Sequence, residues 1–188
     1  MTDVVLFHHA QGLTAGVHAF ADHLRGAGHT VTVPDLYAGV TFDSLEAGVA
    51  HAQEIGMDEI IARGVAAVAG VPDHVVYAGF SLGAMPAQKL AQTRPGALGA
   101  LIYHGGVPAS TFGEQWPALV PLQLHVAEED EWSEVDVARD LAAAAKDGTL
   151  FLYPGSAHLS TDSSLEEYQP ETSALILRRS LEFLARVG

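Results

Sequence analysis

The 188-residue chain contains no cysteine and few basic residues, and each shortage excludes a class of function. Without cysteine there can be no disulfide, no thiol nucleophile and no thiolate-ligated metal, which suits a reducing compartment, so we expect a cytoplasmic location. Nine Lys and Arg residues stand against 23 Asp and Glu residues, for a formal net charge of −14. Such a surface repels phosphate backbones and anionic membranes, so neither a nucleic-acid nor a membrane partner is expected.

Long apolar runs are missing as well. The longest, IIARGVAAVAGV (60–71), is short and contains a charge, so no transmembrane helix is expected. The amino terminus, MTDVVLFHHA (1–10), has no basic segment ahead of its apolar run, which argues against a secretory signal. A hydrophobic content of 48% is still ample for one packed core, and we expect a single domain over residues 1–188.

Short apolar runs rich in β-branched residues alternate with longer helix-compatible segments. Strands are expected at VVLFHH (4–9), TVTVP (30–34), HVVYAGF (74–80), ALIYHG (100–105), LQLHVAE (122–128) and TLFLYPG (149–155). Helices are expected near 15–27, 43–69, 83–93, 133–146 and 171–186. Continuously apolar strands are typical of a parallel sheet that is buried on both faces. The alternation predicts an α/β fold with three layers and a mainly parallel sheet.

In such a sheet, ligands bind beyond the carboxyl ends of the strands. Polar residues follow each predicted strand at that edge: His8, His9, Gln11, Asp35, Tyr37, Ser81, His104, the acidic run from Glu128 to Glu131, and His158. A serine, an acid and a histidine are therefore expected to meet at one edge of the sheet.

The segment GFSLG (79–83) matches the Gly-x-Ser-x-Gly pattern of a nucleophile elbow, in which a serine lies on a sharp strand-to-helix turn. A predicted strand precedes the pattern and a predicted helix follows it, which is the context that the elbow needs. Small residues at both glycine positions allow the strand and helix to approach closely. Ser81 is the candidate nucleophile, and the alternative is an ordinary Gly-Ser-Gly turn without chemistry.

A serine hydroxyl needs a neighbouring base to remove its proton. Among ten histidines, His158 is the candidate because it follows the last predicted strand on a small-residue loop, whereas His125 lies within a strand and is expected to pack. Asp130 is the candidate acid that orients His158, with Glu128, Glu129 and Glu131 as neighbouring alternatives. The chain order of serine, acid and histidine is the one that this elbow requires.

A tetrahedral intermediate needs two backbone N–H donors. Leu82 should supply one, and Ala10 the other, with Gln11 as the alternative on the loop after the first strand. The neighbouring residues His8 and His9 should point to opposite faces of a strand and so cannot easily share an ion; no metal is expected. Further pocket walls are expected at a small set of residues, for which ordinary packing is the alternative: His9, Gln11, Tyr37, His104 and Trp132.

With these residues in place, the chain resembles the dienelactone hydrolase family of α/β-hydrolases over nearly its whole length. The resemblance rests on HHAQGL (8–13), VPDLY (33–37), GFSLG (79–83), YHGG (103–106), HVAEED (125–130) and GSAH (155–158). It implies a catalytic triad of Ser81, Asp130 and His158, oxyanion amides at Ala10 and Leu82, and a minimal fold without a cap domain. An open, shallow pocket is expected from that absence.

The sequence departs from the founding enzymes of this family at three positions. Ser81 stands where they have cysteine, His9 where they have a glutamate, and Asp162 where they have an arginine that grips the substrate's carboxylate. Asp162 is expected to repel a carboxylate.

The function expected from these residues is a cofactor-independent serine hydrolase of a small ester, lactone or thioester, active as a monomer or homodimer. A non-catalytic binding or regulatory protein on the same scaffold is the first alternative. An acyltransferase or perhydrolase that uses the same triad is the second.

Overall fold

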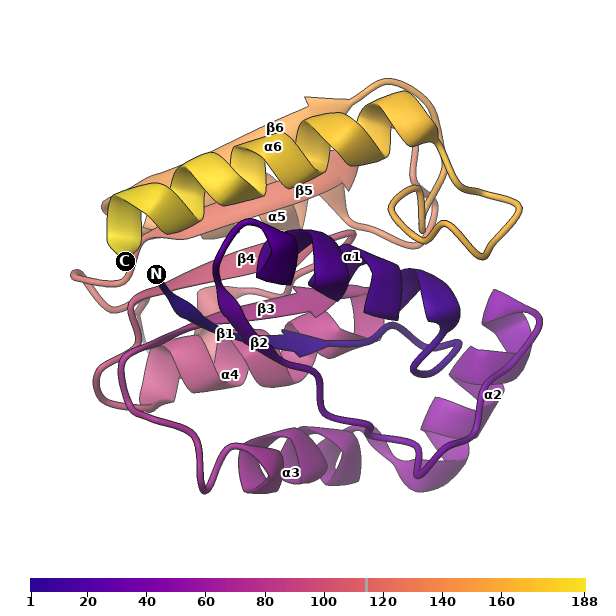
Figure 1. Ribbon diagram of the computed structural model, residues 1–188, viewed down its shortest axis with the longest axis horizontal. Coiled ribbons are helices and arrows are strands. Elements are labelled where there is room, and N and C mark those ends of the chain that lie inside the picture. Colours follow the sequence, from indigo (N-terminus) through magenta and orange to yellow (C-terminus); the bar gives the residue numbers. More distant parts are fainter. Residues whose placement is uncertain (114) are drawn as a thin grey trace.

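The computed structural model describes residues 1–113 and 115–188 and contains a six-stranded sheet in the order β2-β1-β3-β4-β5-β6, with every neighbouring pair parallel (Figure 1). The strands are β1 (Asp3–Phe7), β2 (Thr30–Thr32), β3 (Val75–Phe80), β4 (Gly99–Tyr103), β5 (Leu122–Ala127) and β6 (Gly148–Tyr153). The helices are α1 (Ala15–Gly26), α2 (Leu45–Ile55), α3 (Met57–Ala67), α4 (Ala84–Thr93), α5 (Val135–Ala144) and α6 (Pro170–Val187). Two short 3-10 helices are η1 (Ser81–Gly83) and η2 (Ala109–Thr111). All six predicted strands are confirmed.

The sheet is buried on both faces because its strands are apolar at nearly every position. Neighbouring residues of a strand point to opposite faces, so Val4 and Leu6 of β1 pack on one side while Val5 and Phe7 pack on the other. Helices α1 and α6 cover the first side, and α3, α4 and α5 cover the second (Figure 1). This three-layer arrangement confirms the predicted α/β fold class. In the described part of the chain, no segment forms a cap domain over the sheet.

The predicted helix over 43–69 was wrong: two helices, α2 and α3, occupy this segment. Gly56 separates them with a φ of 91°, a conformation that glycine adopts readily and side chains rarely do. Its N–H closes α2 on the carbonyl oxygen of Ala52, and α3 then starts in a new direction. Gly56 was the one sequence signal for this break. It was missed because apolar residues continue at helical spacing on both sides of the glycine.

The order of strands reverses at β1. From β1 the chain runs out to β2 and then returns to β3 on the opposite side of β1. Phe7 of β1 pairs with Gly79 of β3, so the loop beginning at His8 and the turn at Ser81 leave the sheet side by side. Parallel sheets bind ligands at such a reversal, and the site is built there.

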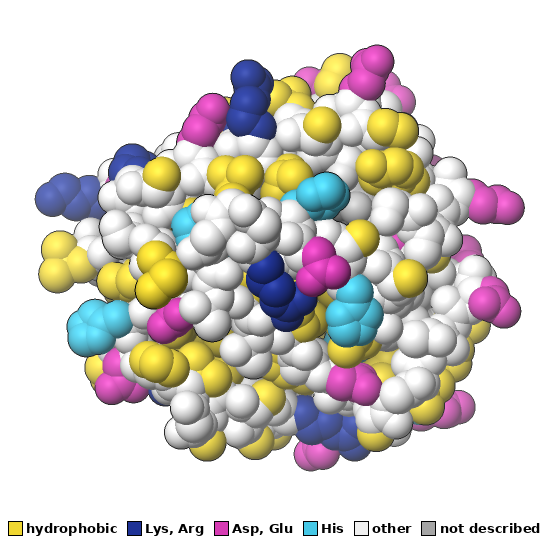
Figure 2. All heavy atoms as spheres, in the orientation of Figure 1, with side chains coloured by type: hydrophobic (Ala, Val, Ile, Leu, Met, Phe, Trp, Pro, Cys, Tyr) yellow, Lys and Arg dark blue, Asp and Glu magenta, His cyan; other side chains and the backbone are white. Residues whose placement is uncertain are grey.

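The surface carries many more acidic than basic side chains, as Figure 2 shows for one face. None of the described helices combines the length and the apolar character that crossing a bilayer requires.

Candidate active site

Ser81 lies on the sharp turn between β3 and the helical segment of η1 and α4. Its φ is 49°, a left-handed conformation that is unfavourable for a serine and common at functional turns. The flanking glycines make the turn possible. A Cβ at Gly79 would collide with the carbonyl oxygen of Gly83, and a Cβ at Gly83 would collide with those of Phe7 and His8. The strained turn therefore presents the Ser81 hydroxyl at the carboxyl edge of the sheet.

The loop after β6 brings His158 to this turn. Its Nε2 lies 2.7 Å from Ser81 Oγ, and its Nδ1 lies 2.7 Å from Asp130 Oδ2. An ionised carboxylate can only accept a hydrogen bond, so Nδ1 carries the ring proton and Nε2 is left to accept from the serine hydroxyl. The structure thus brings together Ser81, Asp130 and His158, which were predicted because each follows the carboxyl end of a strand. Nε2 of His158 is unprotonated, as a general base requires.

Asp130 is buried and accepts three hydrogen bonds. Its donors are His158 Nδ1, the Ser133 hydroxyl at 2.7 Å and the backbone N–H of Trp132 at 2.9 Å. Burial alone would raise the pKa of Asp130, but the hydrogen bond and charge of His158 and the other two donors outweigh it and lower the pKa. Asp130 therefore stays ionised beside the imidazole. The neighbouring acidic candidates are exposed: Glu128, Glu129 and Glu131.

The backbone N–H groups of the loop after β1 differ in whether they have an acceptor. Gln11 N–H donates to His9 Nδ1 at 3.2 Å, which removes this amide from the alternatives. Ala10 N–H donates to no residue that the structure describes, and Ala10 lines a cavity of about 320 Å³ together with Ser81 and Leu82. The N–H of Leu82 lies in the first turn of a helical segment, where the helix offers it no acceptor. The amides of Ala10 and Leu82 thus both lack an acceptor among the described residues, and both residues line the same cavity as Ser81.

A second histidine–aspartate pair lies behind this loop, and sequence reasoning missed it. His9 Nε2 is 2.8 Å from Asp162 Oδ2, and both residues are buried. Asp162 also accepts from the Thr14 hydroxyl and from the N–H and hydroxyl of Ser164. Burial would raise the pKa of Asp162, but these donors outweigh it and lower the pKa to about 2. Two of the three positions that depart from the founding enzymes, His9 and Asp162, thus contact each other rather than facing a substrate.

His8 and His9 use different partners, although both lie just beyond the end of β1 and not within the strand as predicted. His8 Nδ1 donates to the carbonyl oxygen of His9 at 2.7 Å, and its Nε2 accepts the N–H of Leu36 at 3.0 Å. Burial lowers the pKa of His8 to about 4, which keeps the ring neutral. Nowhere in the described ranges do three or more His, Cys, Asp or Glu side chains gather as a metal-ligand group.

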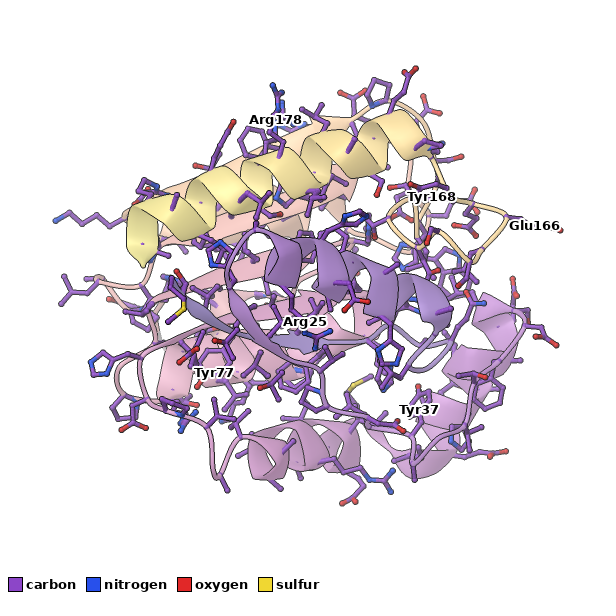
Figure 3. The ribbon with its side chains drawn as sticks, viewed as in Figure 1. Arg25, Tyr37, Tyr77, Glu166, Tyr168 and Arg178 are labelled. Carbon is purple, nitrogen blue, oxygen red and sulfur yellow. The ribbon has the colours of Figure 1, made fainter. Side chains whose placement is uncertain are left out.

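Like His9, two further expected pocket walls lie outside the two cavities near the site. Tyr37 is buried near α2 and its hydroxyl donates to the carbonyl oxygen of Gly48 at 3.4 Å (Figure 3). His104 is buried behind His158, with ring centroids 6.0 Å apart, and its Nε2 is 3.0 Å from the Thr161 hydroxyl. Burial, followed by the charge of His158, lowers the pKa of His104 well below its ordinary value. Both residues support the site from within the core.

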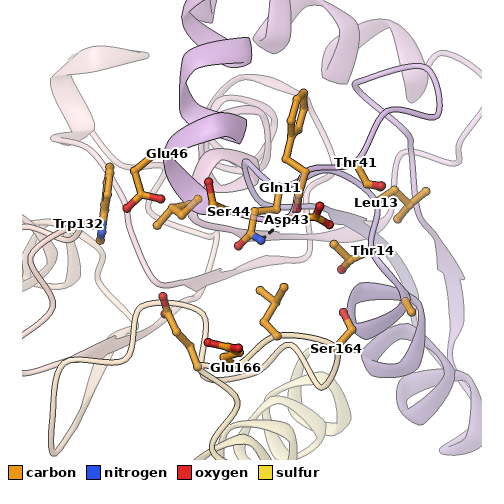
Figure 4. Close-up of a pocket in the computed structure, with 15 residues that line it drawn as sticks. Gln11, Leu13, Thr14, Thr41, Asp43, Ser44, Glu46, Trp132, Ser164 and Glu166 are labelled. Carbon is orange, nitrogen blue, oxygen red and sulfur yellow. Dashed lines mark hydrogen bonds between the residues drawn. The ribbon is translucent and has the colours of Figure 1, made fainter.

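The other two expected walls, Gln11 and Trp132, line an open groove of about 710 Å³ (Figure 4). Trp132 is half-exposed, and its ring centroid lies 6.3 Å from that of His158. The groove is bounded by the loops after β1, β2, β5 and β6, all of which leave the carboxyl edge of the sheet. Through Trp132, one wall of the groove therefore lies next to the His158 ring.

Fold and site together define the class of protein. A parallel sheet with a strained serine turn beside the point where the strand order reverses is typical of an α/β-hydrolase. The family model described as "Dienelactone hydrolase family" matches residues 1–188, and the chain belongs to that family. Membership supports hydrolysis of esters as its activity. No curated protein matches the sequence.

Solved structures share the fold at low sequence identity. A dienelactone hydrolase-like promiscuous phosphotriesterase, P91, from metagenomic libraries superposes with a TM-score of 0.76 at 15% identity, covering 100% of this chain and 87% of that one. A dienelactone hydrolase from Anabaena variabilis gives 0.72 at 19% identity, with coverages of 99% and 87%. An esterase from Thermogutta terrifontis with bound propionate gives 0.72 at 14% identity, with coverages of 100% and 84%.

Proposed function

We propose that this protein is a cofactor-independent serine hydrolase that cleaves a small ester, lactone or thioester through an acyl-enzyme on Ser81. The observation that carries the proposal is the continuous hydrogen-bonded path from Ser81 Oγ to His158 Nε2 and from His158 Nδ1 to Asp130 Oδ2, with 2.7 Å at each step. Both contacts have the length of strong hydrogen bonds, so no rearrangement is needed before proton transfer can begin.

In the first half-reaction, Ser81 Oγ attacks the carbonyl carbon while its proton passes to His158 Nε2. The ionised carboxylate of Asp130 stabilises the imidazolium that forms. The carbonyl oxygen becomes an oxyanion, and the amides of Ala10 and Leu82 stabilise it. His158 then returns its proton to the departing alcohol or thiol as the bond to the carbonyl carbon breaks.

In the second half-reaction, water takes the place of the alcohol. His158 Nε2 removes a proton from the water as its oxygen attacks the acyl carbon, and the same amides stabilise the second oxyanion. Collapse of this intermediate releases the acid and returns the proton to Ser81. The groove beside Trp132 gives water a path to the acyl-enzyme.

Hydrolysis of p-nitrophenyl acetate by the Ser81→Ala variant tests the proposal. The variant should lose turnover by about 10⁵-fold or more, because the remaining groups can only bind the substrate. Its circular dichroism spectrum and Tm should stay those of a folded protein, since the deleted hydroxyl is at the surface of the turn. Unchanged turnover in a folded Ser81→Ala variant would overturn the proposal and favour a binding protein on this scaffold.

A further inference from the structure

The groove beside the active site is negatively charged. Four acidic residues line it, and no Lys, Arg or His is among the described residues that do: Asp43, Glu46, Glu166 and Glu167. Figure 4 shows the Glu46 carboxylate beside the Trp132 indole, with the loop that carries Glu166 on the facing wall. Glu166 is at the outer tip of that loop, and the labelled arginines Arg25 and Arg178 lie on other parts of the surface (Figure 3).

A buried side chain also presents an acceptor to this groove. Gln11 is 4% exposed, and its Nε2 donates to the carbonyl oxygen of Phe42 at 3.2 Å. That bond fixes the orientation of the amide, so Oε1 is the end turned toward the groove. Oε1 accepts no hydrogen bond from any residue that the structure describes. The buried side-chain atoms without a partner do not include this oxygen, so it is open to solvent from the groove, and a donor on a bound ligand can take the place of water there.

The hydroxyl groups of the groove offer few donors in return. Thr14 and Ser164 both direct their hydroxyl protons to the buried carboxylate of Asp162. The amino terminus of α2 also borders the groove, but the Ser44 hydroxyl accepts the N–H of Ala47 and the first turn carries Glu46. The groove therefore presents oxygen acceptors and negative charge, and it suits a ligand that carries donors and positive charge.

The position of His158 shows which part of an ester would occupy the groove. The leaving oxygen must lie against His158 Nε2 to receive its proton. Trp132 is the groove residue whose ring lies 6.3 Å from that of His158, so the alcohol part extends into the groove. The acyl part then extends into the separate cavity of about 320 Å³ that Ser81 lines together with Val49, Ala52 and Met57.

We propose that the preferred substrates are esters of an apolar acyl group with an alcohol that carries a protonated amine. This inference rests on the proposed function and specifies the substrate class of the same site. The ammonium group would lie between the Trp132 indole and the carboxylates of Glu46 and Glu166, with Gln11 Oε1 as a further acceptor. Cations bind favourably over an indole face, and each partly exposed carboxylate adds a modest attraction.

Two butyrate esters of nearly equal shape test this class: the 2-(dimethylamino)ethyl ester, which is cationic at neutral pH, and the neutral 3-methylbutyl ester. The measurement is the ratio of kcat/KM for the cationic ester to that for the neutral ester on each enzyme preparation. In the Glu46→Gln/Glu166→Gln double variant this ratio should fall by about fivefold to tenfold, because two surface attractions are lost. The intrinsic reactivities of the two esters cancel in this comparison of variants.

The control is Glu182→Gln, which removes one carboxylate charge, against two in the double variant, from an exposed position on α6 that does not line the groove. The control should leave the ratio at the wild-type value. Salt provides a second reading, since raising the ionic strength from about 0.01 to 0.5 M should lower the wild-type ratio and leave the double variant's ratio nearly flat. The inference is overturned if the double variant keeps the wild-type ratio, or if Glu182→Gln lowers it equally. If neither ester is cleaved, the proposed function itself fails.

Discussion

Two histidine–aspartate pairs lie at the same edge of the sheet, and they differ in what the second ring nitrogen contacts. In one pair, His158 Nδ1 is 2.7 Å from Asp130, and its Nε2 meets the Ser81 hydroxyl. In the other, His9 Nε2 is 2.8 Å from Asp162, and its Nδ1 accepts a backbone N–H from Gln11. A hydroxyl can give up its proton to an imidazole, whereas a backbone amide at neutral pH cannot.

The comparison teaches that a buried histidine–aspartate pair is not by itself a catalytic device. His158 contacts the Ser81 hydroxyl, a group that can become a nucleophile, so in the proposed mechanism its pair moves a proton. His9 is enclosed by backbone, so its pair holds the loop after β1 in place. Because that loop carries Ala10, the second pair would position the amide that we propose as an oxyanion donor, without taking part in proton transfer.

Equivalent substitutions in the two histidines should separate these roles by the largest margin. His158→Gln should lower kcat for p-nitrophenyl acetate by about 10⁵-fold, because the base is lost. His9→Gln should lower kcat by about tenfold, since the acceptor that holds Gln11 N–H is lost and the loop shifts by a fraction of an ångström. Steady-state kinetics on both variants, with Tm measured alongside, provides the readout. Equal losses in two folded variants would mean that His9 does more than position the loop.

Matched substitutions in the two aspartates should separate activity from stability. Asp130→Asn should lower kcat by about 10³- to 10⁴-fold, because the charge that orients and stabilises protonated His158 is removed. Asp162→Asn should cost about 2 kcal/mol of stability at pH 7, since the pKa of Asp162 is about 2 in the folded protein against an ordinary 3.8. For a chain of this length the corresponding fall in Tm is roughly 4–8 °C.

The pH dependence of the Asp162 effect has a definite sign. A carboxylate whose pKa is lowered by folding stabilises the protein above about pH 4, and this contribution disappears as the pH falls toward 2. The difference in unfolding free energy between wild type and Asp162→Asn should therefore shrink between pH 5 and about pH 2.5. Urea denaturation at both pH values measures it. A difference that stays constant across this range would contradict an ionised, hydrogen-bonded Asp162.

Much of the fold could be predicted because the strands have a strong local signal. Their apolar runs are continuous, and a parallel sheet buried on both faces needs that pattern. The break at Gly56 was missed because helical spacing continues on both sides of it, so only the φ of the glycine separates α2 from α3. Ser81, Asp130 and His158 could also be predicted as site residues, because each follows a strand and parallel strands bring the residues that follow them to one edge of the sheet.

The rest of the site depends on contacts between loops that have no local signal. His9 and Asp162 are separated by 153 positions in the chain, and nothing near either residue indicates the other. The acidic residues of the groove lie on the loops after β2 and β6 and in the first turn of α2, where exposed carboxylates are common in any acidic protein. Their meaning comes from facing one another across a cavity, which only the fold determines. For the same reason, Tyr37 and His104 could not be told from pocket walls before their burial was known.

The central claim is that His158 activates Ser81, and covalent labelling by a fluorophosphonate probe measures this most directly. Intact-protein and peptide mass spectrometry should find a single adduct, on Ser81, formed rapidly by the wild-type protein and by His9→Gln. The His158→Gln variant should label at least about 10³-fold more slowly, because its serine has no base. Labelling of folded His158→Gln at the wild-type rate, or an adduct on a residue other than Ser81, would contradict the account.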